Sequence, residues 1–133
     1  MTSNQLSIGE LSARSGVTAH TLRFYEAEGI LMPAGRLANG HRRYHAGDVQ
    51  WLEFVLRLKR TGMPLADIRA YAALRARGDG TLDERLAMLQ RHRERLAMQI
   101  EALTTNARAL DDKIDLYQSM IATARAPAKK ASP

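Results

Sequence analysis

The residues best suited to chemistry in this sequence are cations and hydrogen-bonding side chains that gather between positions 18 and 44. A guanidinium is always charged, and its planar fork of donors fits both phosphate oxygens and the edge of guanine. Hydroxyl, imidazole and amide groups add further hydrogen bonds. The pattern favours a polyanionic partner, and these are the candidate contact residues: Thr18, His20, Thr21, Arg23, Tyr25, Arg36, Asn39, His41, Arg42, Arg43 and Tyr44.

Other kinds of chemistry find little support in the sequence. The chain contains no cysteine, which excludes disulfides, thiolate metal sites and thiol redox sensing. Its four histidines lack the paired spacing of metal ligands. No nucleophile and base stand in a recognisable pattern, and no glycine-rich loop could hold a phosphate. We therefore expect a protein that is not an enzyme and that uses no metal and no cofactor.

Composition agrees with a small basic protein. The 133 residues include 20 Lys and Arg against 14 Asp and Glu, a formal net charge of +6, which suits nucleic acid. No apolar run approaches the roughly 18 residues that a membrane span needs, and no signal-peptide core is present. We expect a cytoplasmic protein without a membrane partner.

The elements that would position the cations begin with two short helices. Ser7 and Glu10 have capping-box spacing and predict a helix over 8–15, with Ile8, Leu11 and Ala13 pointing inward. Gly16 ends it, and Thr18 is the expected cap of a second helix. Two helices across so short a turn indicate a helix-turn-helix, whose second helix presents its first turns to the major groove.

A glycine-rich ribbon is expected next. Asn39-Gly40 is a strong hairpin signal, and residues 31–32 and 41–44 are the expected strands. The arginines around this turn lie on a loop narrow enough to touch the DNA backbone or a minor groove. The predicted fold is mainly α, a winged helix-turn-helix.

Two amphipathic helices follow, over 48–61 and from Pro64 to about residue 77, with Trp51, Phe54 and Met63 as expected core residues. They complete a predicted DNA-binding domain over 6–77.

A long helix over 81–123 is expected from large apolar residues at alternating four- and three-residue steps, opened by a capping box at Thr81 and Glu84. Its stripe needs a partner, and a second copy of the chain supplies one most simply. Residues 124–133 are predicted to be a disordered basic tail. The expected dimerisation residues are Leu82, Leu86, Leu89, Leu96, Ile100, Leu103, Leu110, Ile114 and Tyr117.

In combination these motifs resemble the MerR family. The resemblance rests on IGELS at 8–12, TLRFYE at 21–26, NGHRRY at 39–44, Asp48-Val49 and the junction at 62–65, and covers about 6–121. It implies that Arg23 and Tyr25 read DNA, that Arg42 and Tyr44 grip its backbone, and that the long helix forms an antiparallel coiled coil. Phe24 and His41 replace tyrosines that are common in the family.

The resemblance also implies a mechanism. Such dimers bind a pseudo-palindrome inside a promoter and bend and untwist the DNA, which realigns the elements that RNA polymerase recognises. About a dozen unpatterned residues follow Ile121, so no separate effector domain is expected. A small-molecule effector pocket near Tyr71, Met88, His92 and Tyr117, or no effector at all, are the two alternatives that remain open.

Three alternative interpretations also remain, two of them structural and one functional. Thr18 could be only a helix cap, and Tyr25 and Tyr44 could be core aromatics. A coiled-coil scaffold whose basic head docks acidic partners would share the dimer and the charge. Preference for a particular DNA sequence would separate that scaffold from a regulator.

Overall fold

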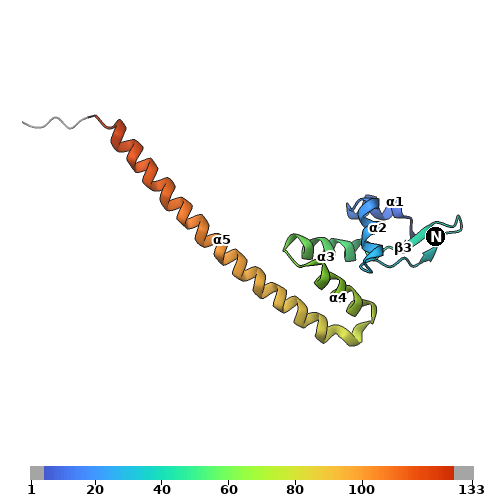
Figure 1. Cartoon of the computed structure of the whole chain (residues 1–133). Coiled ribbons are helices and arrows are strands. Elements are labelled where there is room, and N and C mark those ends of the chain that lie inside the picture. Colours follow the sequence, from blue (N-terminus) through green and yellow to red (C-terminus); the bar gives the residue numbers. More distant parts are fainter. Residues whose placement is uncertain (1–4, 128–133) are drawn as a thin grey trace, which may run out of the picture. The chain divides into compact units, whose positions relative to one another are not determined.

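The computed structural model of the protein describes residues 5–127. The chain forms two compact units, of which the first reaches Arg93 and the second begins at Glu94. The first unit contains four helices, a small sheet and the start of a long helix, α5, which continues through the second (Figure 1).

The helix-turn-helix consists of α1 (Ile8–Ser15) and α2 (Ala19–Ala27). The predicted capping box is present, because Ser7 Oγ accepts a hydrogen bond from the Glu10 amide at 3.1 Å and Glu10 Oε1 accepts one from the Ser7 amide at 3.0 Å. Gly16 ends α1 with a φ of 76°, a left-handed conformation that glycine adopts without strain. Thr18 Oγ1 caps α2 by accepting from the Thr21 amide at 3.2 Å.

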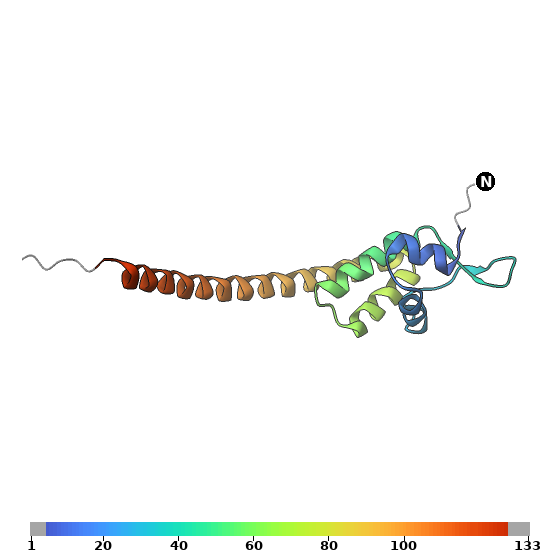
Figure 2. The ribbon, with the colours of Figure 1, turned by 90° about the horizontal axis from the view of Figure 1, so that it is seen from above.

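A three-stranded antiparallel sheet in the order β1-β3-β2 forms the wing and its base, from β1 (Gln5–Leu6), β2 (Gly35–Arg36) and β3 (Arg42–His45). Leu6 pairs with Tyr44, and Arg36 pairs with Arg42. Figure 2 shows the β2–β3 hairpin extending away from the helices of the first unit.

The predicted strand at 31–32 is wrong. Leu31 is buried, and its amide donates to the carbonyl of Tyr25 at 3.2 Å in the turn that ends α2. The strand that pairs with β3 begins four residues later, at Gly35. The sequence analysis also missed β1, because a two-residue strand carries no alternation to detect.

The core of the first unit lies where α1, α2 and the sheet meet α3 (Asp48–Arg60) and α4 (Leu65–Ala76). Trp51 and Met63 are buried as predicted, and Phe54 packs half-buried against the core. Ala13, expected to face inward, is exposed on α1. Its small side chain has little apolar area to bury, so exposure costs little.

A short 3₁₀ turn, η1 (Asp79–Thr81), leads into α5 (Leu82–Arg125). The capping box expected at Thr81 and Glu84 is replaced by another arrangement. The Thr81 hydroxyl donates to the carbonyl of Leu74 at 2.7 Å and accepts from Arg85 Nε at 3.1 Å. This joins the end of α4 to the start of α5.

The boundaries of the long helix differ from those predicted. Met88 and Leu89 pack against the core and His92 is buried, so the first unit includes a part of α5 that the predicted 6–77 domain left out. At the other end α5 continues to Arg125, two residues past the predicted limit of 123. The predicted tail from 128 onward lies outside the described residues.

In the second unit α5 carries large apolar side chains that are about half exposed or more. They include Ile100, Leu103, Leu110, Ile114, Tyr117 and Ile121. Within residues 5–127 no helix is both long and apolar enough to cross a membrane.

Candidate nucleic-acid interface

Helix α2 divides its side chains between core and solvent. Leu22 and Tyr25 are buried, whereas His20, Arg23 and Phe24 are exposed. The division follows from the helical period, because residues three apart share a face. Thr18 caps the N-terminal end of α2, where a helix dipole favours anions.

The hairpin tip of the wing is ordered by its own hydrogen bonds. Arg36 Nη1 donates to the carbonyl of Gly40 at 2.8 Å, and the His41 amide donates to Asn39 Oδ1 at 3.0 Å. Gly40 has a φ of 86°, which a residue with a side chain rarely adopts. The predicted Asn39-Gly40 turn is thereby confirmed, and it presents the cations of the wing on a defined loop.

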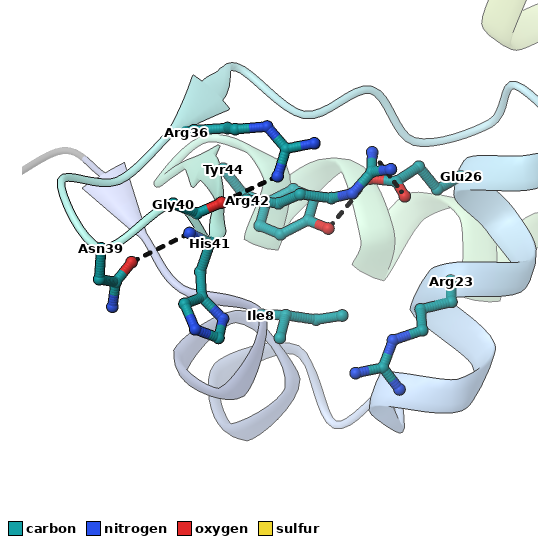
Figure 3. A pocket seen from close by; sticks show the side chains of 9 residues that line it. All are labelled: Ile8, Arg23, Glu26, Arg36, Asn39, Gly40, His41, Arg42 and Tyr44. Atoms are coloured by element: carbon teal, nitrogen blue, oxygen red, sulfur yellow. Dashed lines mark hydrogen bonds and ion pairs between the residues drawn. The ribbon is translucent and has the colours of Figure 1, made fainter.

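An open groove of about 570 Å³ separates α2 from the wing. Figure 3 shows the side chains that line it, which come from α1, α2, both wing strands and the turn between those strands. Three arginines and a histidine contribute to the lining, together with one carboxylate. The lining residues are Ile8, Arg23, Glu26, Arg36, Asn39, Gly40, His41, Arg42 and Tyr44.

The carboxylate of Glu26 joins α2 to the wing. Tyr44 donates its phenolic hydrogen to Glu26 Oε1 at 3.0 Å, and Arg42 Nη1 lies 3.1 Å from Glu26 Oε2 (Figure 3). Burial, and then the hydrogen bond and charge of Glu26, raise the pKa of Tyr44 to about 12. Strand β3 is thus tied to the exposed helix by a phenol and a guanidinium on a single carboxylate.

Two tyrosines expected at the DNA surface are in the core. Tyr44 has no exposed surface, and Tyr25 is 3% exposed with its hydroxyl buried. Burial raises the pKa of Tyr25 as well. This burial favours the core alternative for both rings, and their contact with DNA stays a prediction. Tyr44 reaches the groove through its hydrogen bond to Glu26.

Arg43 lies at the base of the wing, and its contact with DNA stays a prediction. Its guanidinium folds back over Gly35 and donates from Nη2 to the carbonyl of Ala34 at 3.2 Å, while its Nε is buried. A Cβ on Gly35 would lie only 2.9 Å from that Nε. Gly35 also has a φ of 149°, which a residue with a side chain rarely adopts, and Arg43 packs over it outside the residues that line the groove.

The other predicted contact residues occupy two places. Arg23, Arg36, Asn39, His41 and Arg42 line the groove. Thr18, His20 and Thr21 lie at the N-terminal end of α2, where the Thr18 hydroxyl donates to Thr21 Oγ1 at 2.9 Å.

Sequence reasoning did not assign roles to Phe24 and Glu26. Phe24 is 45% exposed beside Arg23, an unusual position for a large apolar ring. Glu26 is an acidic residue on a helix that was expected to meet a polyanion. That mismatch of charge was the signal in the sequence that could have singled it out.

The candidate effector residues lie mostly in packed surroundings. Tyr71 stacks on Trp51 with ring centroids 5.9 Å apart, and His92 lies 2.7 Å from the Thr61 hydroxyl. Met88 packs half-buried against the core. In the second unit, Tyr117 is exposed.

The expected dimerisation residues also fall into two groups. Leu89 packs against the core of its own chain, which its place in the stripe did not predict, and Leu96 is half-buried. The others are exposed: Leu82, Leu86, Ile100, Leu103, Leu110, Ile114 and Tyr117.

A helix-turn-helix with a cationic wing, followed by a long helix with an exposed apolar stripe, defines a class of DNA-binding regulators. The family model for MerR helix-turn-helix regulatory proteins matches residues 6–74, and that for the MerR DNA-binding region matches residues 49–113. The chain therefore belongs to the MerR family. It is a DNA-binding transcriptional regulator and not an enzyme.

Individual relatives agree. An uncharacterized HTH-type transcriptional regulator from Haemophilus influenzae is 40% identical over 103 residues, which cover 77% of this chain and 76% of the relative. A solved MerR family regulator from Listeria monocytogenes is 34% identical with a TM-score of 0.81, over 90% of this chain and 91% of its own. HiNmlR, a MerR family regulator lacking the sensor domain and solved bound to promoter DNA, is 36% identical with a TM-score of 0.74, over 91% of this chain and 94% of its own.

Proposed function

We propose that the protein acts in the cytoplasm as a homodimer, joined through α5, that binds a pseudo-palindromic promoter site and regulates transcription by bending and untwisting it. The observation that carries the proposal is the groove between α2 and the wing, which Arg23 lines from the helix and Arg36 and Arg42 line from the β2–β3 hairpin. Cations on both a helix and a hairpin can hold phosphates on either side of a groove, which fixes the register of a protein on DNA.

Each element has a distinct part in the proposal. Helix α2 enters the major groove, where Arg23 reaches a guanine edge or the adjacent phosphate and His20 reaches a base edge. The hydroxyls of Thr18 and Thr21 and the amides at the start of α2 hold a phosphate. On the wing, Arg36, Asn39, His41 and Arg42 contact the backbone.

The dimer is supported by the apolar stripe of α5. Burying a large aliphatic side chain contributes about 1.5–3 kcal/mol, and the stripe exposes several of them in the described chain. Two copies packed antiparallel would cover these side chains and place two α2 helices around a two-fold axis. A two-fold symmetric protein reads a two-fold symmetric site, with its half-sites set apart by the spacing of the two helices.

The mechanism of the MerR family implies that the protein deforms its promoter. The energy that this requires is within reach of a small protein. Bending a site smoothly costs on the order of 1–6 kcal/mol, which the contacts of two wings and two helices can offset. RNA polymerase is the partner that gains from the realigned promoter elements. Support also comes from HiNmlR, which lacks a sensor domain and was solved bound to promoter DNA.

The contact assignment can be tested by gel shifts with Arg42→Ala over several salt concentrations. The probe is the duplex that the unmodified full chain enriches from a random pool. We expect affinity to fall by roughly tenfold or more with circular dichroism unchanged, because a phosphate contact is lost. Lys59→Ala is the matched control, since Lys59 is exposed on α3 and does not line the groove. Unchanged affinity of Arg42→Ala at every salt concentration would refute the assignment of the wing.

A further inference from the structure

We propose that Glu26 is a positioning residue that holds Arg42 in the DNA-free protein in place of a DNA phosphate, so that DNA must displace this carboxylate to engage Arg42. The inference rests on the proposed function, because it concerns how the free protein prepares one of the cations that would contact DNA.

One of the cations that line the groove, Arg42, is already ion-paired within the protein. Arg42 Nη1 lies 3.1 Å from Glu26 Oε2, and Glu26 contributes the one carboxylate among the residues that line this groove. The Arg42 side chain is 49% exposed, whereas that of Glu26 is only 15% exposed. The guanidinium is therefore free to move toward an incoming ligand, and the carboxylate is not.

Glu26 is held in place from its other side. Tyr44 donates its hydroxyl to Glu26 Oε1 at 3.0 Å from a fully buried position on β3. The two carboxylate oxygens thus have different partners, a fixed phenol and a mobile guanidinium. When Arg42 turns away, Glu26 stays hydrogen-bonded to Tyr44 and remains in the groove.

A carboxylate and a phosphate offer a guanidinium equivalent acceptor oxygens, so they compete for Arg42. When a DNA phosphate replaces Glu26 as the partner of Arg42, the ion pair with Glu26 is lost. The negative charge of Glu26 is then left beside the DNA backbone. Electrostatic contacts supply essentially all of the affinity for random DNA. Glu26 therefore lowers the affinity of the free protein for DNA in general.

The variant Glu26→Gln isolates the charge. The glutamine amide oxygen can still accept the hydrogen bond from Tyr44, so the link between α2 and β3 is kept while Arg42 is released. Glu28→Gln is the matched control, since it makes the same change two residues away and also breaks an ion pair. Glu28 Oε2 lies 2.9 Å from Arg69 Nη1, and neither residue lines the groove.

The experiment measures binding of the full chain to a fluorescent random-sequence duplex by anisotropy over a range of salt concentrations. We expect Glu26→Gln to bind roughly three- to tenfold more tightly than the unmodified protein, and Glu28→Gln to stay within about twofold. In an Arg42→Gln background, Glu26→Gln should give no more gain than Glu28→Gln.

Three results would overturn the inference: unchanged or weaker binding by Glu26→Gln, an equal gain for both charge removals, or a full gain without Arg42. A full gain without Arg42 would show that the negative charge of Glu26 repels DNA directly and does not act through Arg42. Failure of the proposed function looks different, because the unmodified chain would then not bind the duplex even at low salt, and both proposals would fall.

Discussion

The hydroxyl oxygen of Thr61, at the end of α3, lies 2.7 Å from Nε2 of the buried His92 on α5. The Thr61 hydroxyl also lies 2.7 Å from the carbonyl of Arg57, to which it donates its single hydrogen. With its single hydrogen directed to that carbonyl, the hydroxyl accepts a hydrogen bond from Nε2 of His92. This hydrogen bond joins α3 to the first turns of the long helix within the first unit.

Replacing His92 by alanine should destabilise the first unit by about 1–3 kcal/mol, because the change removes both a buried hydrogen bond and packed side-chain volume. Urea unfolding followed by circular dichroism measures the loss. His41→Ala, at the exposed tip of the wing, is the control and should change stability by less than about 0.5 kcal/mol. Equal stability of the two variants would show that the link between α3 and α5 contributes little.

Gly35→Ala should destabilise the base of the wing by about 1–3 kcal/mol. Gly35 has a φ of 149°, and an added Cβ would meet the guanidinium of Arg43 at 2.9 Å. The steric part of the cost should disappear when Arg43 is shortened, so Arg43→Ala and Gly35→Ala together should cost less than their sum. Thermal unfolding of both single variants and the double variant measures this coupling. Strict additivity would contradict the close approach.

The unfolding free energy should fall at alkaline pH through Tyr44. Its pKa is raised from 10.0 to about 12, so the folded state favours the neutral phenol. The stabilisation is fully present below pH 10 and is lost as the pH rises through about 12. Tyr44→Phe lacks this contribution and should show a shallower decline over that range in urea unfolding. Parallel profiles for the two proteins would contradict the raised pKa.

Ile114→Glu should weaken the dimer. The side chain is 51% exposed in the described chain and belongs to the stripe that a second copy would cover. Losing its burial costs about 1.5–3 kcal/mol per chain, so the dissociation constant should rise by at least about tenfold. Analytical ultracentrifugation measures it. Thr105→Glu, on the opposite side of the helix by heptad position, should leave the dimer intact. Equal weakening by both variants would place the interface elsewhere.

Much of the first unit could be predicted because its helix ends are encoded locally. Ser7, Gly16 and Thr18 each act within four residues, and all three have the conformations and contacts expected of them. The sheet could not be predicted in the same way. The pairing of Leu6 with Tyr44 depends on a segment far along the chain, and two-residue strands show no alternation.

The sequence predicted the cations that line the groove, but it did not predict the contacts that hold them in place. Arginines near a hairpin turn are visible in a sequence, and Arg23, Arg36 and Arg42 do line one groove. A tyrosine, by contrast, suits both a core and a surface, so the burial of Tyr25 and Tyr44 depends on how α2 and β3 join the common core. The contacts of Glu26 were hidden for the same reason, because its hydrogen bond with Tyr44 joins positions 18 residues apart.

The central claim is that the chain reads DNA sequence as a symmetric dimer. Selection of binding sites by the full chain from a random pool of duplexes, followed by sequencing, tests it most directly. We predict enrichment of a two-fold symmetric site whose half-sites are read by α2, and loss of that enrichment with Arg23→Ala. Recovery of duplexes with no shared sequence would contradict sequence-specific regulation and would leave only a basic coiled-coil protein.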